Sequence, residues 1–513
     1  MWARRPLYSG LLSLISGTAL WLSFYSPLFP LAWVGLVPYL YFLLRRPAWK
    51  WVLIGHGLMT LAYLGGVLYW IPRVLVVYGD LSWVVALPAF LLMLMALSLI
   101  LLPFSLLTRW AAERSVSVTL LCVPGFWLLT ELCRNYFVLN GFPWALLGYS
   151  QYPYSWIVQV ADVSGVYLVS VLVMAGNAAL LGALWFKSFR PLVPFAVLFL
   201  CANLYGAYRV NYWQPDSGSV LKVALVQPNI ELDQDQEHYA DKYFKTLAGY
   251  YQQAANEGAQ WVIFPEAPNP FLYEQDFYFT SFWKRQTATH GAYLLFNSAL
   301  VEIDPEVRYF NSAVLLGPQG EEEYRYHKTH LVPFGEYVPL ADWLGLFFEP
   351  LVQEVGGFSP GQELRVGNIS GTRFATLICY EGIFPELSRE YVRQGAEILV
   401  VITNDSWYGR TAAPSQHLQM AAFRAIETRK PLLRSANSGY TVVIDPLGQQ
   451  GQKIGLFEEG MFIAEVAGNN YRSIYSYTGE WINIALIGVT LMLALGGRFR
   501  KSDSQGSKRS KRK

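Results

Sequence analysis

The chain has 513 residues, of which 53% are apolar and only 15% are charged. Because an ordinary soluble domain has roughly 25% charged residues, this composition excludes a wholly soluble protein and indicates a part embedded in a bilayer. Four cysteines spread over the chain exclude a disulfide-stapled domain, and a net charge of +2 gives no reason to expect a nucleic-acid partner.

Eight apolar stretches are candidates for membrane-spanning helices, since a helix needs about 20 mainly apolar residues to cross the hydrocarbon core. Seven of them fall within residues 1–210, which we interpret as a transmembrane domain, and the last is a C-terminal span at 479–497. The sixth is long enough to include a part that does not span. The first seven candidates are 8–25, 29–45, 51–71, 82–107, 116–133, 156–186 and 191–208.

Positive charge falls in alternate loops between these spans, and a basic tail follows the last span at 498–513. Cytoplasmic loops of membrane proteins carry an excess of Lys and Arg. We therefore predict a multi-pass protein with both termini and the tail in the cytoplasm. The long segment after the seventh span then lies on the opposite face, which at a bacterial inner membrane is the periplasm. The basic residues of these loops are Arg45 and Arg46, Arg109 and Arg114, and Lys187 and Arg190.

Ionisable residues inside the apolar half could mark a pathway, because charges at membrane depth are costly and often functional. Glu131, Asp162 and His56 are residues of this kind. Glu131 and Arg134, however, flank the end of the fifth predicted span, so an interfacial ion pair between them is the simpler expectation.

Residues 218–467 change to short β-rich runs separated by helical stretches, which predicts a globular α/β domain. Polar helical stretches at 234–257, 384–394 and 415–429 would cover the sheet. The predicted strands are 220–227, 261–264, 292–299, 312–316, 373–379, 398–403 and 441–444.

Three residues with catalytic potential stand at the ends of apolar runs in this domain. Glu266 follows one run, Cys379 ends another, and Lys328 begins a turn-rich segment that reaches Glu336. Strand ends are where α/β sheets build their sites. A thiol must lose its proton to attack a carbonyl, so a cysteine nucleophile needs a base and a positive group nearby. Glu266 can act as the base, and Lys328 can stabilise the thiolate and an oxyanion.

Each of these residues has a simpler interpretation on its own. A single cysteine at the end of an apolar strand is usually a small buried hydrophobe, and a Pro-Glu pair after a strand is a weaker signal still. The three positions together favour catalysis. No metal and no cofactor are expected, because His327, His330 and His417 do not have a ligand spacing with a cysteine or carboxylate pair.

The ordered motifs Phe-Pro-Glu266, His-Lys328-Thr-His-Leu-Val-Pro-Phe-Gly-Glu336 and Ile-Cys379-Tyr-Glu resemble the Glu-Lys-Cys triad of the nitrilase (carbon-nitrogen hydrolase) superfamily. With its membrane spans, the whole chain is similar to the apolipoprotein N-acyltransferase family. The similarity continues through Asn404-Asp-Ser-Trp-Tyr-Gly409, Gln416-His-Leu-Gln-Met420, Leu433-Arg-Ser-Ala-Asn437 and, in the membrane half, Gly141-Phe-Pro-Trp144-Ala-Leu-Leu-Gly-Tyr-Ser150.

This resemblance implies a nitrilase-like αββα sandwich at 218–467, attached to a polytopic α-helical membrane domain. It implies that Cys379 takes an acyl chain from a phospholipid, typically phosphatidylethanolamine, and forms a thioester. The chain is then passed to the free amine of the diacylglyceryl-cysteine of an apolipoprotein. In this scheme Glu266 is the base and Lys328 stabilises the oxyanion.

The resemblance also implies which residues support the triad and contact substrate. Members of the family often have Trp where this chain has Gln236, so the resemblance leaves the substrate contact of that loop open. A monomer is expected. The implied supporting residues are Glu336, Tyr380, Glu381 and Trp144.

Two stretches of the globular part favour a lipid substrate. Residues 340–351 are too apolar for a solvated loop, and residues 271–283 are rich in aromatic side chains. Such segments belong at a membrane interface. Alternatively, they pack on the transmembrane half or on each other.

Two other functions stay open. A membrane-tethered hydrolase of the same superfamily would cleave a small amide or nitrile, with water as the second acceptor, but it would not need an extensive membrane half. A degenerate domain that only scaffolds lipoproteins would not need all three triad positions.

Overall fold

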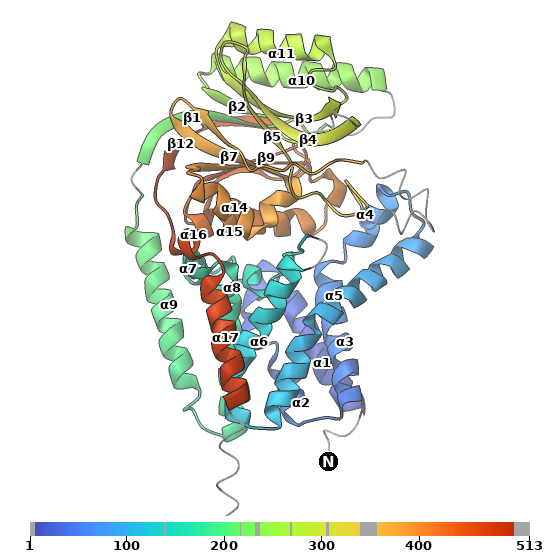
Figure 1. Ribbon diagram of the computed structural model, residues 1–513, viewed down its shortest axis with the longest axis vertical. Coiled ribbons are helices and arrows are strands. Elements are labelled where there is room, and N and C mark those ends of the chain that lie inside the picture. Colours follow the sequence, from blue (N-terminus) through green and yellow to red (C-terminus); the bar gives the residue numbers. More distant parts are fainter. Residues whose placement is uncertain are drawn as a thin grey trace, which may run out of the picture. The chain divides into compact units, whose positions relative to one another are not determined.

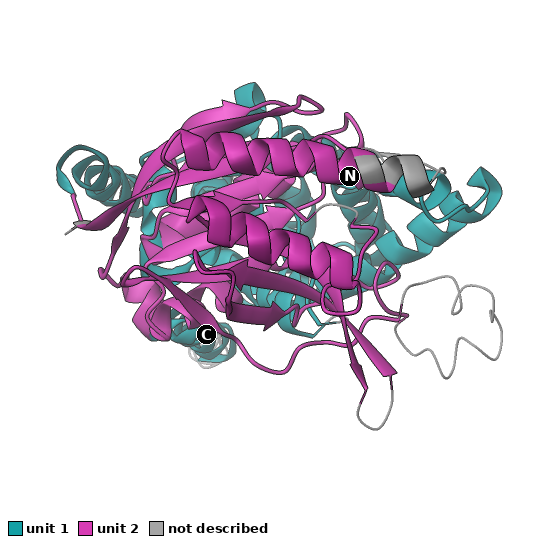
Figure 2. Ribbon diagram, turned by 90° about the horizontal axis from the view of Figure 1, so that it is seen from above, with its two compact units in different colours: residues 1–213, 478–513 teal, residues 214–477 magenta. Residues whose placement is uncertain are grey.

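The computed structural model describes residues 6–137, 140–215, 217–230, 236–266, 269–303, 307–338 and 357–496. These form two compact units, one of residues 1–213 with 478–513 and one of residues 214–477 (Figure 2). The first unit is helical, and the second contains β-sheets and helices (Figure 1).

Long apolar helices make up most of the first unit. Its longer helices are α1 (Pro6–Leu22), α3 (Trp49–Val67), α5 (Trp83–Ala112), α6 (Val116–Tyr136), α8 (Val166–Phe186), α9 (Leu192–Tyr212) and α17 (Trp481–Gly496). Its shorter elements are η2 (Ser26–Trp33), α2 (Val37–Leu44), α4 (Ile71–Val77), η3 (Leu147–Gln151), η4 (Ile157–Val160) and α7 (Ala161–Ser164).

Each predicted span contains helix in the structure, although the boundaries differ. Among the described residues, five segments are long and apolar enough to cross a membrane, and α3 with α4 gives a sixth if their 55° bend lies within one span. The shorter helices α1 and α17 are also apolar. The predicted span 51–71 ends too late, because α3 ends at Val67 and Pro72, which has no backbone N–H, lies in the first turn of α4. The prediction of a polytopic helical membrane domain is confirmed.

The basic loops of the helical unit meet at one end of it. Arg45, just after α2, lies over the ring of Trp185 in α8, with 5.2 Å between the guanidinium carbon and the ring centroid. Arg109, near the end of α5, lies 5.1 Å from the ring centroid of Trp49 and donates from Nε to the carbonyl of Pro47 at 2.9 Å. The loops that follow α2, α5 and α8 therefore lie on the same side of this unit (Figure 1).

The second unit contains two six-stranded sheets, in the orders β12-β1-β2-β3-β4-β5 and β11-β10-β9-β8-β7-β6. The first sheet consists of β1 (Ser217–Gln227), β2 (Trp261–Ile263), β3 (Tyr293–Ile303), β4 (Val307–Leu316), β5 (Glu322–His327) and β12 (Gly460–Asn469). The second consists of β6 (Val366–Ile369), β7 (Thr372–Ile378), β8 (Ile398–Thr403), β9 (Leu432–Ala436), β10 (Thr441–Ile444) and β11 (Gln450–Ile454).

The sequence did not predict β5, β6, β9, β11 and β12. Four of these, all except β9, are the edge strands of the two sheets. Two of them, β5 and β11, carry charged and polar residues, as exposed edge strands do, so they lack the apolar run that identifies a central strand.

The two sheets pack face to face, and each is covered by helices on its outer side (Figure 1). Trp261 of β2 faces the second sheet, where its ring centroid lies 4.9 Å from that of Phe374 in β7. Val262, the next residue, points the other way into the core under α10 (Gln236–Asn256) and α11 (Phe277–His290). Helices α14 (Pro385–Arg393) and α15 (Ala413–Thr428) cover the second sheet. The predicted αββα sandwich is confirmed.

Most aromatic side chains of the stretch 271–283 lie in or against the core. Phe279 and Trp283 lie on α11 and are 0% and 1% exposed, packed with the first sheet and α10. Of the aromatic residues in the stretch, Phe277 and Tyr278, at the start of the helix, are the two that are largely exposed. The expectation of an interfacial segment is therefore wrong for the buried residues, because helical periodicity turns them toward the sheet. The apolar stretch 340–351 lies outside the described residues.

Candidate active site

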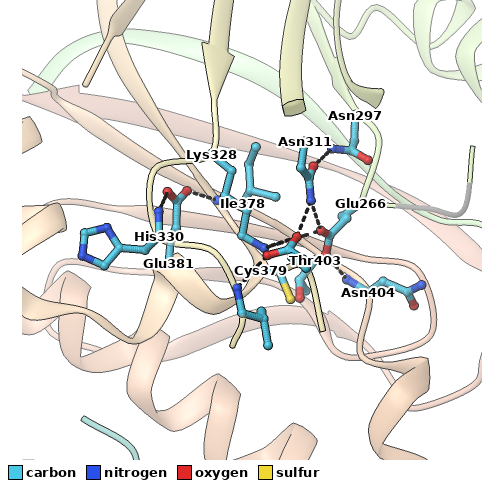
Figure 3. A network of polar contacts seen from close by, with 12 residues as sticks. Glu266, Asn297, Asn311, Lys328, His330, Ile378, Cys379, Glu381, Thr403 and Asn404 are labelled. Atoms are coloured by element: carbon cyan, nitrogen blue, oxygen red, sulfur yellow. Dashed lines mark hydrogen bonds and ion pairs between the residues drawn. The ribbon is translucent and has the colours of Figure 1, made fainter. Parts of the chain in front are cut away.

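Strand ends bring the three predicted catalytic side chains together (Figure 3). Glu266 follows β2, and Lys328 comes directly after β5, both in the first sheet. Cys379 comes directly after β7 in the second sheet. Lys328 Nζ lies 3.9 Å from Glu266 Oε1, and the charges of Glu266 and Lys328 both act on the pKa of the Cys379 thiol. The site therefore lies where the ends of the two sheets meet.

Lys328 is shared by two carboxylates. Its side chain is 1% exposed, and Nζ donates a 2.9 Å hydrogen bond to Glu336 Oε1. The other oxygen of Glu336 accepts from the backbone N–H of Val332 at 2.8 Å, which ties this carboxylate to the turn after the lysine. Glu336 thus holds the ammonium in a position close to Glu266.

Asn311 of β4 links the two carboxylates. Its amide nitrogen donates to Glu266 Oε1 at 2.9 Å and to Glu336 Oε1 at 2.8 Å. Its amide oxygen accepts from the side chain of Asn297 on β3 at 2.7 Å, which fixes the orientation of the amide. The sequence prediction missed both asparagines, although an amide inside an apolar strand was an available signal.

The second oxygen of Glu266 is held by the other sheet. Glu266 Oε2 accepts from the backbone N–H of Asn404, which follows β8, at 3.1 Å. The carboxylate therefore spans the two sheets, with Asn311 at one oxygen and Asn404 at the other (Figure 3).

The backbone at Cys379 has the left-handed conformation, with φ of +51°. Such a conformation is strained for a residue with a side chain, and functional sites often contain it. Cys379 begins the short helix η5 (Cys379–Ile383) and its side chain is buried. The turn places the thiol at the end of its strand, beside the base.

Glu381 holds this turn through both of its carboxylate oxygens. One of its oxygens accepts from the hydroxyl of Tyr326 at 2.6 Å and from the backbone N–H groups of Thr329 at 2.7 Å and His330 at 3.1 Å. The other accepts from the backbone N–H of Ile378 at 2.8 Å. The fully buried carboxylate thereby joins the turn of the nucleophile to the segment that carries Lys328 (Figure 3).

Electrostatics at the site favour a neutral thiol at rest. Burial raises the pKa of the Cys379 thiol, the Glu266 charge raises it further, and Lys328 acts in the opposite direction. Burial also raises the pKa of Glu266, whereas Lys328 lowers it. For Lys328, burial alone would lower the pKa, but Glu336 and Glu266 together raise it well above its usual value. Thus Lys328 is charged, and the pKa of Glu266 is raised above its usual value.

A second polar group lies behind the nucleophile and was not predicted as part of the site. It consists of Asp405, after β8, His417, on α15, and Arg434, on β9, and all three are buried. Arg434 Nη2 donates to Asp405 Oδ2 at 2.6 Å. The motifs that contain these residues were noticed in the sequence, but only the fold shows that they meet under Cys379.

The other predicted contact residues lie as follows. Tyr380 is buried next to the nucleophile, with its ring edge-to-face against Phe384 at 5.0 Å between centroids. Gln236 is the first residue of α10. Trp144 belongs to the helical unit, where it is buried with its ring centroid 5.0 Å from that of Trp70. A contact of Trp144 with substrate stays a prediction.

The expected ion pair of Glu131 and Arg134 takes another form. Both side chains are buried, and both bind the backbone of the loop that contains Trp144. Glu131 Oε1 accepts from the N–H of Leu147 at 2.7 Å, and Arg134 Nη2 donates to the carbonyl of Ala145 at 2.9 Å. Ala145 has φ of +59°, so these buried charges support a strained loop instead of a surface ion pair.

Comparison with known proteins agrees with both units. Residues 222–475 match the carbon-nitrogen hydrolase family, and residues 16–179 match the apolipoprotein N-acyltransferase N-terminal domain. An apolipoprotein N-acyltransferase of Geobacter metallireducens is 37% identical, over 97% of this chain and 96% of its own. One of Pseudomonas putida is 32% identical, over 98% of this chain and 99% of its own. The crystal structure of an amidase from Nesterenkonia sp. is 22% identical over 50% of this chain and 94% of its own, with a TM-score of 0.38.

The relatives with this name cover both the membrane half and the triad-bearing half, so the prediction of an acyltransferase is confirmed. The same relatives and the apolar helices confirm the prediction of a multi-pass protein of the inner membrane. The chain therefore belongs to the apolipoprotein N-acyltransferase family, and Glu266, Lys328 and Cys379 lie within the part that matches the carbon-nitrogen hydrolase family.

Proposed function

We propose that this enzyme moves an acyl chain from a phospholipid to the N-terminal amine of the diacylglyceryl-cysteine of an apolipoprotein, by way of a thioester on Cys379. The observation that carries the proposal is the meeting of a buried ammonium, a partly buried carboxyl and a buried thiol, with Lys328 Nζ 3.9 Å from Glu266 Oε1. A site of this composition can activate a nucleophile and stabilise an oxyanion without exposing either to water.

In the first half-reaction Glu266 accepts the proton of the Cys379 thiol as sulfur attacks the carbonyl carbon of a phospholipid ester. The ammonium of Lys328 stabilises the negative oxygen of the tetrahedral intermediate. The ester C–O bond then breaks, and Glu266 returns the proton to the leaving hydroxyl of the lysophospholipid. The products are the Cys379 thioester and the lysophospholipid. Glu266 is again ionised and can accept a proton in the second half-reaction.

In the second half-reaction the amine of the lipoprotein attacks the thioester carbonyl. Glu266 takes a proton from the amine, the C–S bond breaks, and the proton returns to the sulfur of Cys379. Water has to be kept out during the lifetime of the thioester, since it would release a free fatty acid. The burial of Cys379 and Lys328 supports this exclusion.

The acyl donor we propose is phosphatidylethanolamine, through its sn-1 chain, and this rests on the resemblance to the family. Vesicles that differ only in head group test it. Thioester formation should be fastest with phosphatidylethanolamine, and equal rates with phosphatidylglycerol would contradict the assignment.

We further propose that the loops after α2, α5 and α8 face the cytoplasm, with both termini, and that the catalytic unit is periplasmic. The support is the gathering of Arg45 and Arg109 at one end of the helical unit. The test uses intact spheroplasts that express variants in which the exposed Cys201 is replaced by serine. A membrane-impermeant thiol reagent should label the variant with Gln452→Cys, in the catalytic unit. It should not label the variant with Ser188→Cys, after α8. Labelling of Ser188→Cys alone would reverse the orientation.

A monomer should suffice, because Glu266, Lys328 and Cys379 all belong to one chain and meet within one unit. Light scattering in detergent should give the mass of one chain of 58.1 kDa after subtraction of the detergent. A stable dimer would contradict this part of the proposal.

Intact-protein mass spectrometry after incubation with a defined phospholipid tests the mechanism. The wild type should gain the mass of one acyl chain, hydroxylamine should remove it, and Cys379→Ala should gain nothing. A mass gain that survives in Cys379→Ala would overturn the assignment of the nucleophile. The hydrolase alternative predicts instead that free fatty acid is released at the full rate without any amine acceptor.

A further inference from the structure

The strained backbone of Cys379 is held by a side chain from another element. His417 of α15 is fully buried, and its Nε2 lies 3.2 Å from the carbonyl oxygen of Cys379. A carbonyl oxygen can only accept a hydrogen bond, so Nε2 carries the proton in this contact. The protonation state of the other ring nitrogen does not change this conclusion.

The imidazole is itself fixed from behind by two buried charges. His417 Nδ1 lies 3.0 Å from Asp405 Oδ1 and 3.2 Å from Arg434 Nη2. Although burial alone would raise the pKa of Asp405, Arg434 and His417 bring it well below the usual value, so Asp405 is ionised. Burial and the nearby Arg434 lower the pKa of His417, whereas Asp405 acts in the opposite direction.

Asp405 also accepts from the strand that leads to it. The hydroxyl of Thr403, the last residue of β8, donates to Asp405 Oδ1 at 3.1 Å. Asp405 therefore contacts three buried side chains, and its contact with His417 connects it to the carbonyl of Cys379.

The contact with His417 also fixes the peptide group that follows Cys379. In a trans peptide the C=O and the N–H point in opposite directions. Since the carbonyl points to His417, the N–H of Tyr380 points away from α15. At a sharp turn that carries a nucleophile, the N–H of the next residue is a common donor to an oxyanion.

We propose that His417, oriented by Asp405 and Arg434, is a positioning residue for acyl transfer: it holds the Cys379 carbonyl and so sets the direction of the thiol and of the following N–H. The proposal rests on the role of Cys379 proposed above. His417 takes no proton from substrate, because Glu266 is the base.

Two amide variants separate positioning from support of the fold. The amide nitrogen of His417→Gln can reach the position of Nε2 and donate to Cys379, whereas that of His417→Asn matches Nδ1 and keeps only the contact with Asp405. We expect the single-turnover rate constant of thioester formation to fall by about 10²-fold in His417→Asn at saturating phospholipid, and by less than about tenfold in His417→Gln. A purely structural role predicts the opposite order, since a buried charge such as Asp405 is costly to leave without its partner.

The measurement distinguishes folding from positioning, because the amplitude of acyl-mass gain reports the folded fraction and the rate constant reports the chemistry. If His417→Asn yields no folded protein, His417→Leu takes its place as the variant without a donor to Cys379. Equal rate constants for the Gln and the Asn or Leu variants, or a slower Gln variant, would overturn the proposal. Failure of the wild type to form a thioester would overturn the proposed function instead, so the two failures are distinguishable.

Discussion

The two sheets of the catalytic unit contribute to the site in different ways. From the first sheet and its loops come charged groups that face one another, Glu266, Lys328 and Glu336. From the second sheet come the nucleophile and two carboxylates, Glu381 and Asp405, whose hydrogen bonds go to backbone and to buried partners. On the first side Glu266 takes up and returns a proton in the proposed reaction, whereas the carboxylates on the second side hold the turn around Cys379.

This comparison predicts the largest loss of activity for the base of the first sheet. Glu266→Gln keeps an acceptor for the N–H of Asn404 but cannot take the thiol proton. Because general base catalysis is worth about 10²–10⁴-fold, we expect thioester formation to slow by about 10³-fold. Single-turnover mass spectrometry measures this rate, with Glu381→Gln as a carboxylate-to-amide control in the second sheet. A loss of less than tenfold would show that another group takes the proton.

The pH dependence of thioester formation should be set by the charged residues of the first sheet. Glu266 acts as a base only when ionised, so thioester formation should speed up as pH rises through its pKa, which burial raises. Glu336 raises this pKa further and Lys328 lowers it. Glu336→Gln should therefore move the rise in rate to lower pH, and Lys328→Met should move it to higher pH. Pre-steady-state pH profiles test both, and shifts in the same direction would contradict the arrangement.

In the second sheet, the carboxylate-to-amide substitution Glu381→Gln should lower the free energy of unfolding of the protein. In the wild type, two carboxylate oxygens of Glu381 accept the hydrogen bonds of Tyr326, Thr329 and Ile378. Glu381→Gln leaves one acceptor oxygen for these donors. The new amide NH₂ group, itself a donor, then faces donors at the other position. We expect a loss of about 3 kcal/mol in the free energy of unfolding, or roughly 5–10 °C in Tm. Thermal unfolding in detergent measures it. A rate constant reduced as strongly as in Glu266→Gln, with Tm unchanged, would give Glu381 a chemical role instead.

The sequence offered Glu266, Lys328 and Cys379 as candidates because each stands beside turn-forming residues at the end of an apolar or turn-rich run, and the structure brings the three side chains together. It missed Asn311 and His417 because their roles depend on neighbours in space. Asn311 becomes part of the site only when β4 lies beside β5 and near the end of β2, and His417 only when α15 packs under the turn after β7. Strand pairing and helix packing over long separations in sequence cannot be read from a local period.

The smallest effect is expected for the exposed Phe277 at the start of α11, and its contrast with the buried Phe279 tests how the aromatic stretch is divided between core and surface. Phe279→Ala removes a fully buried ring and should cost about 3–5 kcal/mol of unfolding free energy. Phe277→Ala, two residues earlier, changes a side chain that is 83% exposed and should cost less than about 0.5 kcal/mol. Thioester formation by the Phe277→Ala protein in phospholipid bilayers should match the wild type. A slower rate that higher phospholipid concentration restores would instead assign this end of α11 to the capture of lipid, and the two faces of one helix would then have separate tasks.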